Sequence, residues 1–156
     1  MLPLSWRGTV ILSPEAGGNP EQVLDRLAAG LAEQSARALR REPGCITFEG
    51  GFFRFVSNWN LLVPISWGRL SAEAGPDCVR VHYDITFLEV VVFATFGAGF
   101  LAVMLCLPAS DLGAMRYVFP IVAWAWLVGG NIALALGRFP AFIRKQGRGR
   151  HTRSVT

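Results

Sequence analysis

Histidine and cysteine are the residues best able to act as metal ligands, bases or nucleophiles, and this sequence holds few of them. His82 lies in an alternating stretch and His151 near the end of the chain, so neither a metal site nor a Ser-His-Asp arrangement has its parts together. Cys45, Cys78 and Cys106 are an odd number without CxxC spacing, which favours reduced structural thiols. We therefore predict no catalytic residue, no metal, no cofactor and no enzymatic activity.

Polar residues inside two long apolar runs are the stronger candidates for a functional role. Residues 85–107 contain Glu89 as their only charge, and residues 117–137 contain Asn131 and no charge before Arg138 follows. A hydrocarbon core about 30 Å thick is crossed by about 20 helical residues, so both runs are predicted transmembrane helices. Glu89, Asn131 and Arg138 are candidate intramembrane polar contacts.

Two interpretations of Glu89 stay open at this stage. It lies only about 6 Å inside the start of its run, so it could reach the membrane surface or pair with Arg138. An intramembrane acid could also be a proton or cation ligand.

Small residues recur at every fourth position of both runs and let neighbouring helices approach closely. These candidate helix-packing residues are Ala94, Ala98 and Ala102 in the first run, and Ala125, Gly129 and Ala133 in the second. A rotation of 100° per residue places Glu89 and Asn131 nearly opposite these stripes. If the small stripes pack the hairpin together, the polar stripes face outward, which predicts a homo-oligomer or a larger membrane-protein partner.

Positive charge is concentrated at the end of the chain. Residues 1–84 carry eight Arg against nine acids, whereas residues 138–156 carry five Arg and one Lys with no acid. This excess beside the second run predicts that both termini are cytoplasmic. Residues 138–156 form a predicted basic tail rather than a nucleic-acid-binding patch. Its candidate lipid-headgroup contacts are Arg144, Lys145, Arg148 and Arg150.

Residues 1–84 have the patterns of an α+β head. Asn19-Pro20 predicts a helix start, and an amphipathic pattern continues from there to about Arg41. Alternating apolar residues predict an early strand over Trp6–Leu12. We expect a βαββββ head, in which one amphipathic helix lies on an antiparallel sheet.

The remaining strands are predicted as two hairpins. The first turns at Gly50-Gly51 and pairs two runs so that Ile46 and Phe48 share a face with Phe53 and Phe55. The second turns near Gly75-Pro76, and its last strand alternates Val79, Val81, Tyr83 and Ile85 with polar residues. Because almost no linker separates this strand from the first apolar run, we expect the head to lie against the membrane surface.

A string of residues between positions 48 and 87 resembles small uncharacterised bacterial membrane proteins that have a sheet-bearing head before a hydrophobic hairpin. The positions are Phe48, Gly50, Phe53, Arg54, Trp59, Asn60, Ile65, Ser66, Gly68, Tyr83, Ile85 and Phe87. The resemblance implies an architecture and no activity.

The organisation predicted from the sequence is a head (1–84), a transmembrane hairpin (85–137, with helices at about 85–107 and 117–137) and a tail (138–156). We expect a non-enzymatic inner-membrane accessory or interaction protein that docks a partner or itself through the hairpin. The alternative is a subunit of an oligomeric transporter or channel in which Glu89 and Asn131 line the path. Since two helices cannot enclose a pore, the alternative also requires an assembly.

Overall fold

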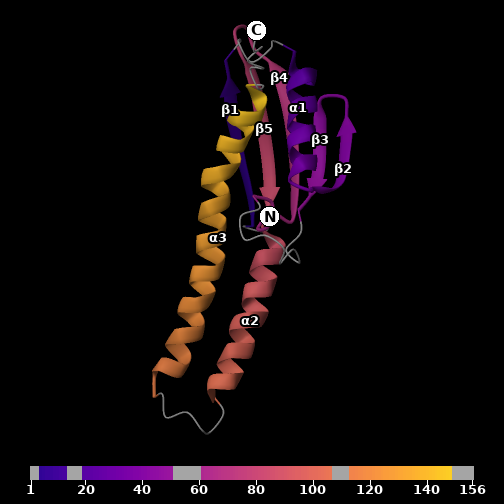
Figure 1. The fold of residues 1–156 in the computed structure, drawn as a ribbon. Helices are drawn as coiled ribbons and strands as arrows, with labels where there is room; N and C mark the ends of the chain where they lie inside the picture. Colours follow the sequence, from indigo (N-terminus) through magenta and orange to yellow (C-terminus); the bar gives the residue numbers. More distant parts are fainter. Residues whose placement is uncertain (1–3, 14–18, 51–60, 107–112, 149–156) are drawn as a thin grey trace, which may run out of the picture.

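The computed structural model describes residues 4–13, 19–50, 61–106 and 113–148, and it has the predicted α+β class (Figure 1). An antiparallel sheet and one helix are followed by two long apolar helices, and the end of the second long helix returns to the sheet. In chain order, the elements are β1 (Ser5–Leu12), α1 (Pro20–Glu33), β2 (Arg37–Glu42), β3 (Cys45–Glu49), β4 (Trp67–Ala74), β5 (Val79–Thr86), α2 (Leu88–Cys106) and α3 (Met115–Gly147).

The five strands lie in the order β1-β5-β4-β3-β2, and every neighbouring pair is antiparallel. β4 and β5 form the predicted second hairpin, with Trp67 opposite Thr86 and Ala74 opposite Val79. The alternation in β5 places its apolar residues on the inner face of the sheet, where they are buried: Val79, Val81, Tyr83 and Ile85.

The first helix begins as predicted and ends earlier than predicted. The Asn19 side chain accepts a hydrogen bond from the Glu21 backbone N–H at 3.0 Å, which caps α1. The helix ends at Glu33 instead of about Arg41, and Ser35 follows with a φ of 60°. Residues Arg37–Glu42 form β2 because they pair with one edge of β3, and this pairing overrides their helical pattern.

The predicted hairpin at Gly50-Gly51 is wrong. β3 has β2 on one edge and β4 on the other, so neither edge is left for a strand after Gly51. Instead, β3 forms a hairpin with β2 through the turn between Glu42 and Cys45, where Gly44 has a φ of 75°. Phe53 and Phe55, the predicted partners of β3, lie outside the described residues.

Helix α3 is shared between the hairpin and the head. It runs for 33 residues, about 50 Å, and continues ten residues beyond its predicted end at 137. Its last three turns pack on the inner face of the sheet beside α1 (Figure 1). Residues 138–147 are therefore a core helix of the head rather than part of a tail.

The contacts of α3 in the head are made by residues spaced four apart, which lie on one side of a helix. Phe139 is completely buried, with its ring centroid 6.1 Å from Phe48 and 5.5 Å from Tyr83. Ile143 is also fully buried, and a Cβ on Gly147 would lie 2.4 Å from the Leu12 side chain. The helix thus fits the sheet closely over three turns.

The strands run along the same direction as the hairpin helices (Figure 1). β5 passes into α2 through the single residue Phe87, whose backbone N–H donates to the Leu4 carbonyl at 2.9 Å. The head therefore extends along the direction of the hairpin, with one end of the sheet beside α2.

Arg41 ties α1 to β2 at the end of the head farther from the hairpin. Its side chain is partly buried, forms an ion pair with Glu21, and has its Nε 3.1 Å from the Asp25 carboxylate. Burial lowers the pKa of Arg41, but the hydrogen bonds and charges of the two acids outweigh it, so the pKa lies above its ordinary value. Arg41 therefore stays charged and acts as a structural link.

Candidate functional site

The sheet has an inner face covered by α1 and α3 and an outer face of polar side chains. The strand register places residues of three neighbouring strands in rows across this outer face. One row is Arg7, Asp84 and Arg69; the next, farther from the hairpin, is Thr9, His82 and Ser71.

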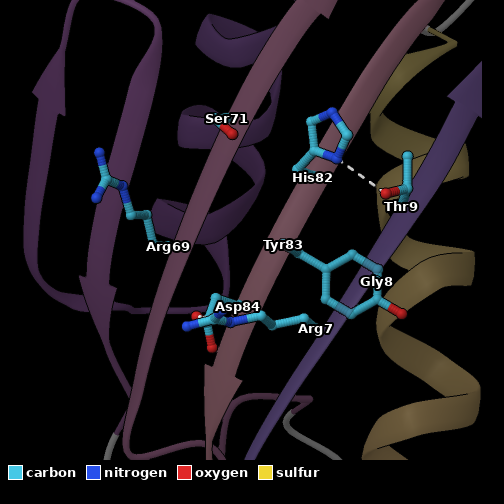
Figure 2. Close-up of a pocket in the computed structure, with 8 residues that line it drawn as sticks. All are labelled: Arg7, Gly8, Thr9, Arg69, Ser71, His82, Tyr83 and Asp84. Atoms are coloured by element: carbon cyan, nitrogen blue, oxygen red, sulfur yellow. Dashed lines mark hydrogen bonds and ion pairs between the residues drawn. The ribbon is translucent and has the colours of Figure 1, made fainter.

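These two rows line a pocket of about 340 Å³ over β5, between β1 and β4 (Figure 2). Its lining residues are Arg7, Gly8, Thr9, Arg69, Ser71, His82, Tyr83 and Asp84. Arg7 Nε donates to Asp84 Oδ2 at 2.7 Å, and Thr9 Oγ1 lies 2.8 Å from His82 Nδ1. Asp84 and His82 thus each have a polar partner on β1, Arg7 and Thr9 respectively.

Arg69 is on the opposite side of the pocket from Arg7 (Figure 2). Its Nη2 lies 3.9 Å from Cys45 Sγ, and among the described residues no carboxylate forms a salt bridge with it. The Asp84 carboxylate directly across from Arg69 in the register is bonded to Arg7. One guanidinium at this pocket is therefore available to an anion.

Thr9, His82 and Glu73 form a hydroxyl–imidazole–carboxylate series, with His82 Nε2 3.6 Å from Glu73 Oε2. Catalysis by such a series depends on a site from which water is excluded. Here the His82 and Glu73 side chains are 41% and 70% exposed, so the pocket is better suited to binding. Within the described ranges, no group of three or more His, Cys, Asp and Glu residues could hold a metal ion.

Two helices, α2 and α3, are long and apolar enough to cross a membrane. Both helices of the hairpin carry large apolar side chains on their outer surface: Phe96 on α2 is 76% exposed and Trp126 on α3 is 77% exposed. Between the helices, Trp124 Nε1 donates to Thr95 Oγ1 at 3.0 Å, and Thr95 donates to the Val91 carbonyl at 2.7 Å. Thr95 was not predicted as a contact, although an indole N–H in an apolar setting needs an acceptor.

The Thr95–Trp124 hydrogen bond shows which residues of α2 and α3 lie at the same level, and so where Glu89 and Asn131 lie along the hairpin. Counting seven residues from Trp124 to Asn131 and seven back from Thr95 to Leu88 places Asn131 level with the first turn of α2. The Glu89 backbone N–H donates to Ser66 Oγ at 2.8 Å, which also places it at the head. Both polar residues therefore lie at the head end of the hairpin, not at its middle.

The small residues predicted to pack the helices differ in exposure between α2 and α3. Ala94 is buried and Ala98 and Ala102 are half-buried on α2. On α3 the predicted stripe is exposed: Ala125, Gly129 and Ala133. A Cβ on Gly129 would meet no atom within 4 Å.

The opposite face of α3 makes the contacts because it carries the residues that the other elements require. Trp124 finds its acceptor on α2, and the same side of the helix leads to buried Ala135 and Phe139. Asn131 is half-buried there and donates to the Leu127 carbonyl at 2.6 Å. Packing against α2 and the sheet thus determines the rotation of α3.

Asn131 and Arg138 come together in a small pocket of about 60 Å³ where α3 enters the head. The other lining residues are Leu61, Val63, Pro64, Leu134 and Ala135. Glu89, the third predicted polar contact, does not line it. This arrangement suits a structural junction and does not form a path through the hairpin.

Comparison with known proteins returns no match. No family model, no curated protein and no solved structure matches the chain. Function must therefore be inferred from the geometry of this chain.

The predicted lipid contacts lie high on the head. Arg144, Lys145 and Arg148 are exposed at the end of α3, and Arg150 lies outside the described residues. Arg144 follows Asn131 by 13 residues, about 20 Å along the helix.

Proposed function

We propose that this protein is a small, non-enzymatic accessory protein of a bacterial inner membrane. Its hairpin spans the bilayer and associates with a partner, and its head stands at the cytoplasmic surface in a fixed orientation. The observation that supports the proposal is the continuity of α3, which belongs to both the hairpin and the core of the head. A body joined in this way can present its head to a partner without a flexible linker.

Aromatic residues at both ends of the hairpin support its insertion. Trp6 and Trp67, which are 51% and 40% exposed, lie at the end of the sheet beside α2. Tyr117 and Phe119 are exposed at the other end of the hairpin. Tryptophan and tyrosine favour the interfaces of a bilayer, and the two groups are separated by roughly the length of α2.

The orientation follows from basic residues near the spans, which favour the cytoplasm. The sequence between the two spans holds Arg116 and Asp111, whereas Arg138, Arg144 and Lys145 follow the second span. We expect a C-terminal GFP fusion to fluoresce and a C-terminal alkaline phosphatase fusion to be inactive. Active phosphatase would contradict the cytoplasmic head.

The exposed stripe of α3 supports association within the membrane. Ala125, Gly129 and Ala133 face away from α2, and their small size allows another helix to approach closely. We propose that a second copy of the chain packs on this stripe. The transporter alternative has less support, because Glu89 and Asn131 both lie at the head end of the hairpin.

Disulfide crosslinking in native membranes tests this association. In a chain whose native cysteines are replaced, Gly129→Cys is expected to give a disulfide-linked dimer on mild oxidation. Leu134→Cys is the control, since it is exposed on another side of the same helix. Monomer at both positions, with no larger crosslinked product, would overturn the proposed self-association.

A further inference from the structure

The outer-face pocket lies in the half of the head nearer to the hairpin. Asp84, in the row with Arg7 and Arg69, precedes the start of α2 by four residues, about 13 Å of extended chain. Trp67 is two residues before Arg69 on the same strand, so both side chains lie on the outer face, with Trp67 closer to the hairpin. In the proposed topology, this face meets the bilayer surface at Trp67.

The charges of the pocket favour a single anionic group. Arg7 and Arg69 carry two positive charges, and Asp84 offsets one of them through its bond to Arg7. Arg69 keeps its charge without a carboxylate partner among the described residues, and Ser71 lines the same pocket with its hydroxyl. A planar guanidinium and a hydroxyl at one pocket are suited to oxygen atoms of a phosphate.

We propose that this pocket binds a phosphate group, and that the group belongs to the headgroup of an anionic lipid. The proposal rests on the membrane insertion proposed above. The headgroup layer adds about 5–7 Å outside the hydrocarbon core, so its outer edge lies within about 8 Å of the row that contains Arg69. Within about one Debye length of an anionic surface the attraction is retained.

The pocket on the sheet is a different place for lipid recognition from the end of α3, where the sequence predicted it. Arg144 and Lys145 lie about 20 Å beyond Asn131 along α3, whereas Arg69 is one pleat above Trp67. The pocket lies over β5 between side chains of β1 and β4, so residues of all three strands can contact a bound group.

Native mass spectrometry of the full chain in detergent, titrated with phosphatidylglycerol, tests the proposal. Arg69→Gln is expected to lower the association constant for the lipid about fivefold, the loss typical of one Arg at an anionic surface. Arg80→Gln is the matched control, since Arg80 is on the same outer face but four residues farther along β5 from the hairpin than Asp84. Its effect is expected to be less than twofold.

A second variant and a second ligand separate the role of the positive charge from that of the lipid. Arg69→Lys keeps the charge but not the planar guanidinium, so its loss of binding is expected to be smaller than that of Arg69→Gln, with an unchanged melting temperature for all three variants. Inorganic phosphate is expected to compete with the lipid in the wild-type protein. Equal losses in Arg69→Gln and Arg80→Gln would overturn the pocket, and binding of inorganic phosphate without binding of phosphatidylglycerol would overturn the lipid source. A chain that does not fractionate with membranes, or active phosphatase in the fusion experiment, would instead contradict the proposed function.

Discussion

A chain that ends at Gly137 is expected to lose its folded head. The truncation removes Phe139 and Ile143, which are fully buried against the sheet. Removing large side chains of this kind from a core costs about 2–5 kcal/mol each, and a domain has only about 5–15 kcal/mol of total stability. We expect the truncated head to be digested rapidly in limited proteolysis of the detergent-purified protein.

A chain that ends at Arg148 is the control for this truncation. It removes the residues after α3 and keeps every described contact of the helix with the sheet. Its proteolysis pattern for the head should match that of the full chain. If both truncated chains kept a protease-resistant head, residues 138–147 would be a tail and not a part of the core.

Phe139→Ala is expected to destabilise the head strongly. The Phe139 ring packs against Phe48, Tyr83 and Phe142, and its loss should lower the free energy of unfolding by about 3–5 kcal/mol. For a chain of this size that corresponds to a fall of roughly 10 °C in melting temperature. Differential scanning fluorimetry in detergent measures it.

Phe96→Ala is the matched control, because Phe96 is an exposed phenylalanine on α2. Its removal leaves no cavity within the chain, and we expect a change of less than about 0.5 kcal/mol. A similar fall in melting temperature for both variants would show that Phe139 contributes no more than an exposed ring.

Much of the sheet could be predicted because its signals are local. The alternation of Val79, Val81 and Tyr83 identifies a half-buried strand, and Asn19-Pro20 identifies the start of α1. β2 was missed because Arg37–Glu42 lacks alternating apolar residues, and its pairing with β3 is a tertiary interaction. No local signal distinguishes such an edge strand from a helical extension.

The continuation of α3 was obscured by charge. Arg138, Arg144 and Lys145 made the segment resemble a tail, yet all three are exposed and the buried face is formed by residues between them. The pattern Ala135, Phe139, Ile143 was a usable signal for a core helix. The rotation of α3 about its axis is set by the contacts of Trp124 with α2 and of the last turns with the sheet. Small residues do not set it, because they pack closely only where another helix faces them.

The candidate pocket could be predicted in part. The β4–β5 hairpin register alone brings Arg69 beside Asp84 and Ser71 beside His82. The position of β1 next to β5, which brings Arg7 and Thr9, depends on a pairing across more than 70 residues of sequence. A long-range pairing of this kind has no signature in a local pattern.

The central claim is that α3 joins the hairpin and the head as one continuous helix in the bilayer. Spin labels at Ile121 and Arg144, in a chain whose native cysteines are replaced, measure it directly by pulsed electron resonance in liposomes. Both positions are exposed on α3 and are separated by 23 residues. We predict a single narrow distance distribution centred near 35 Å, about the length of a continuous helix between them. A broad distribution, or a distance well below this value, would contradict the account.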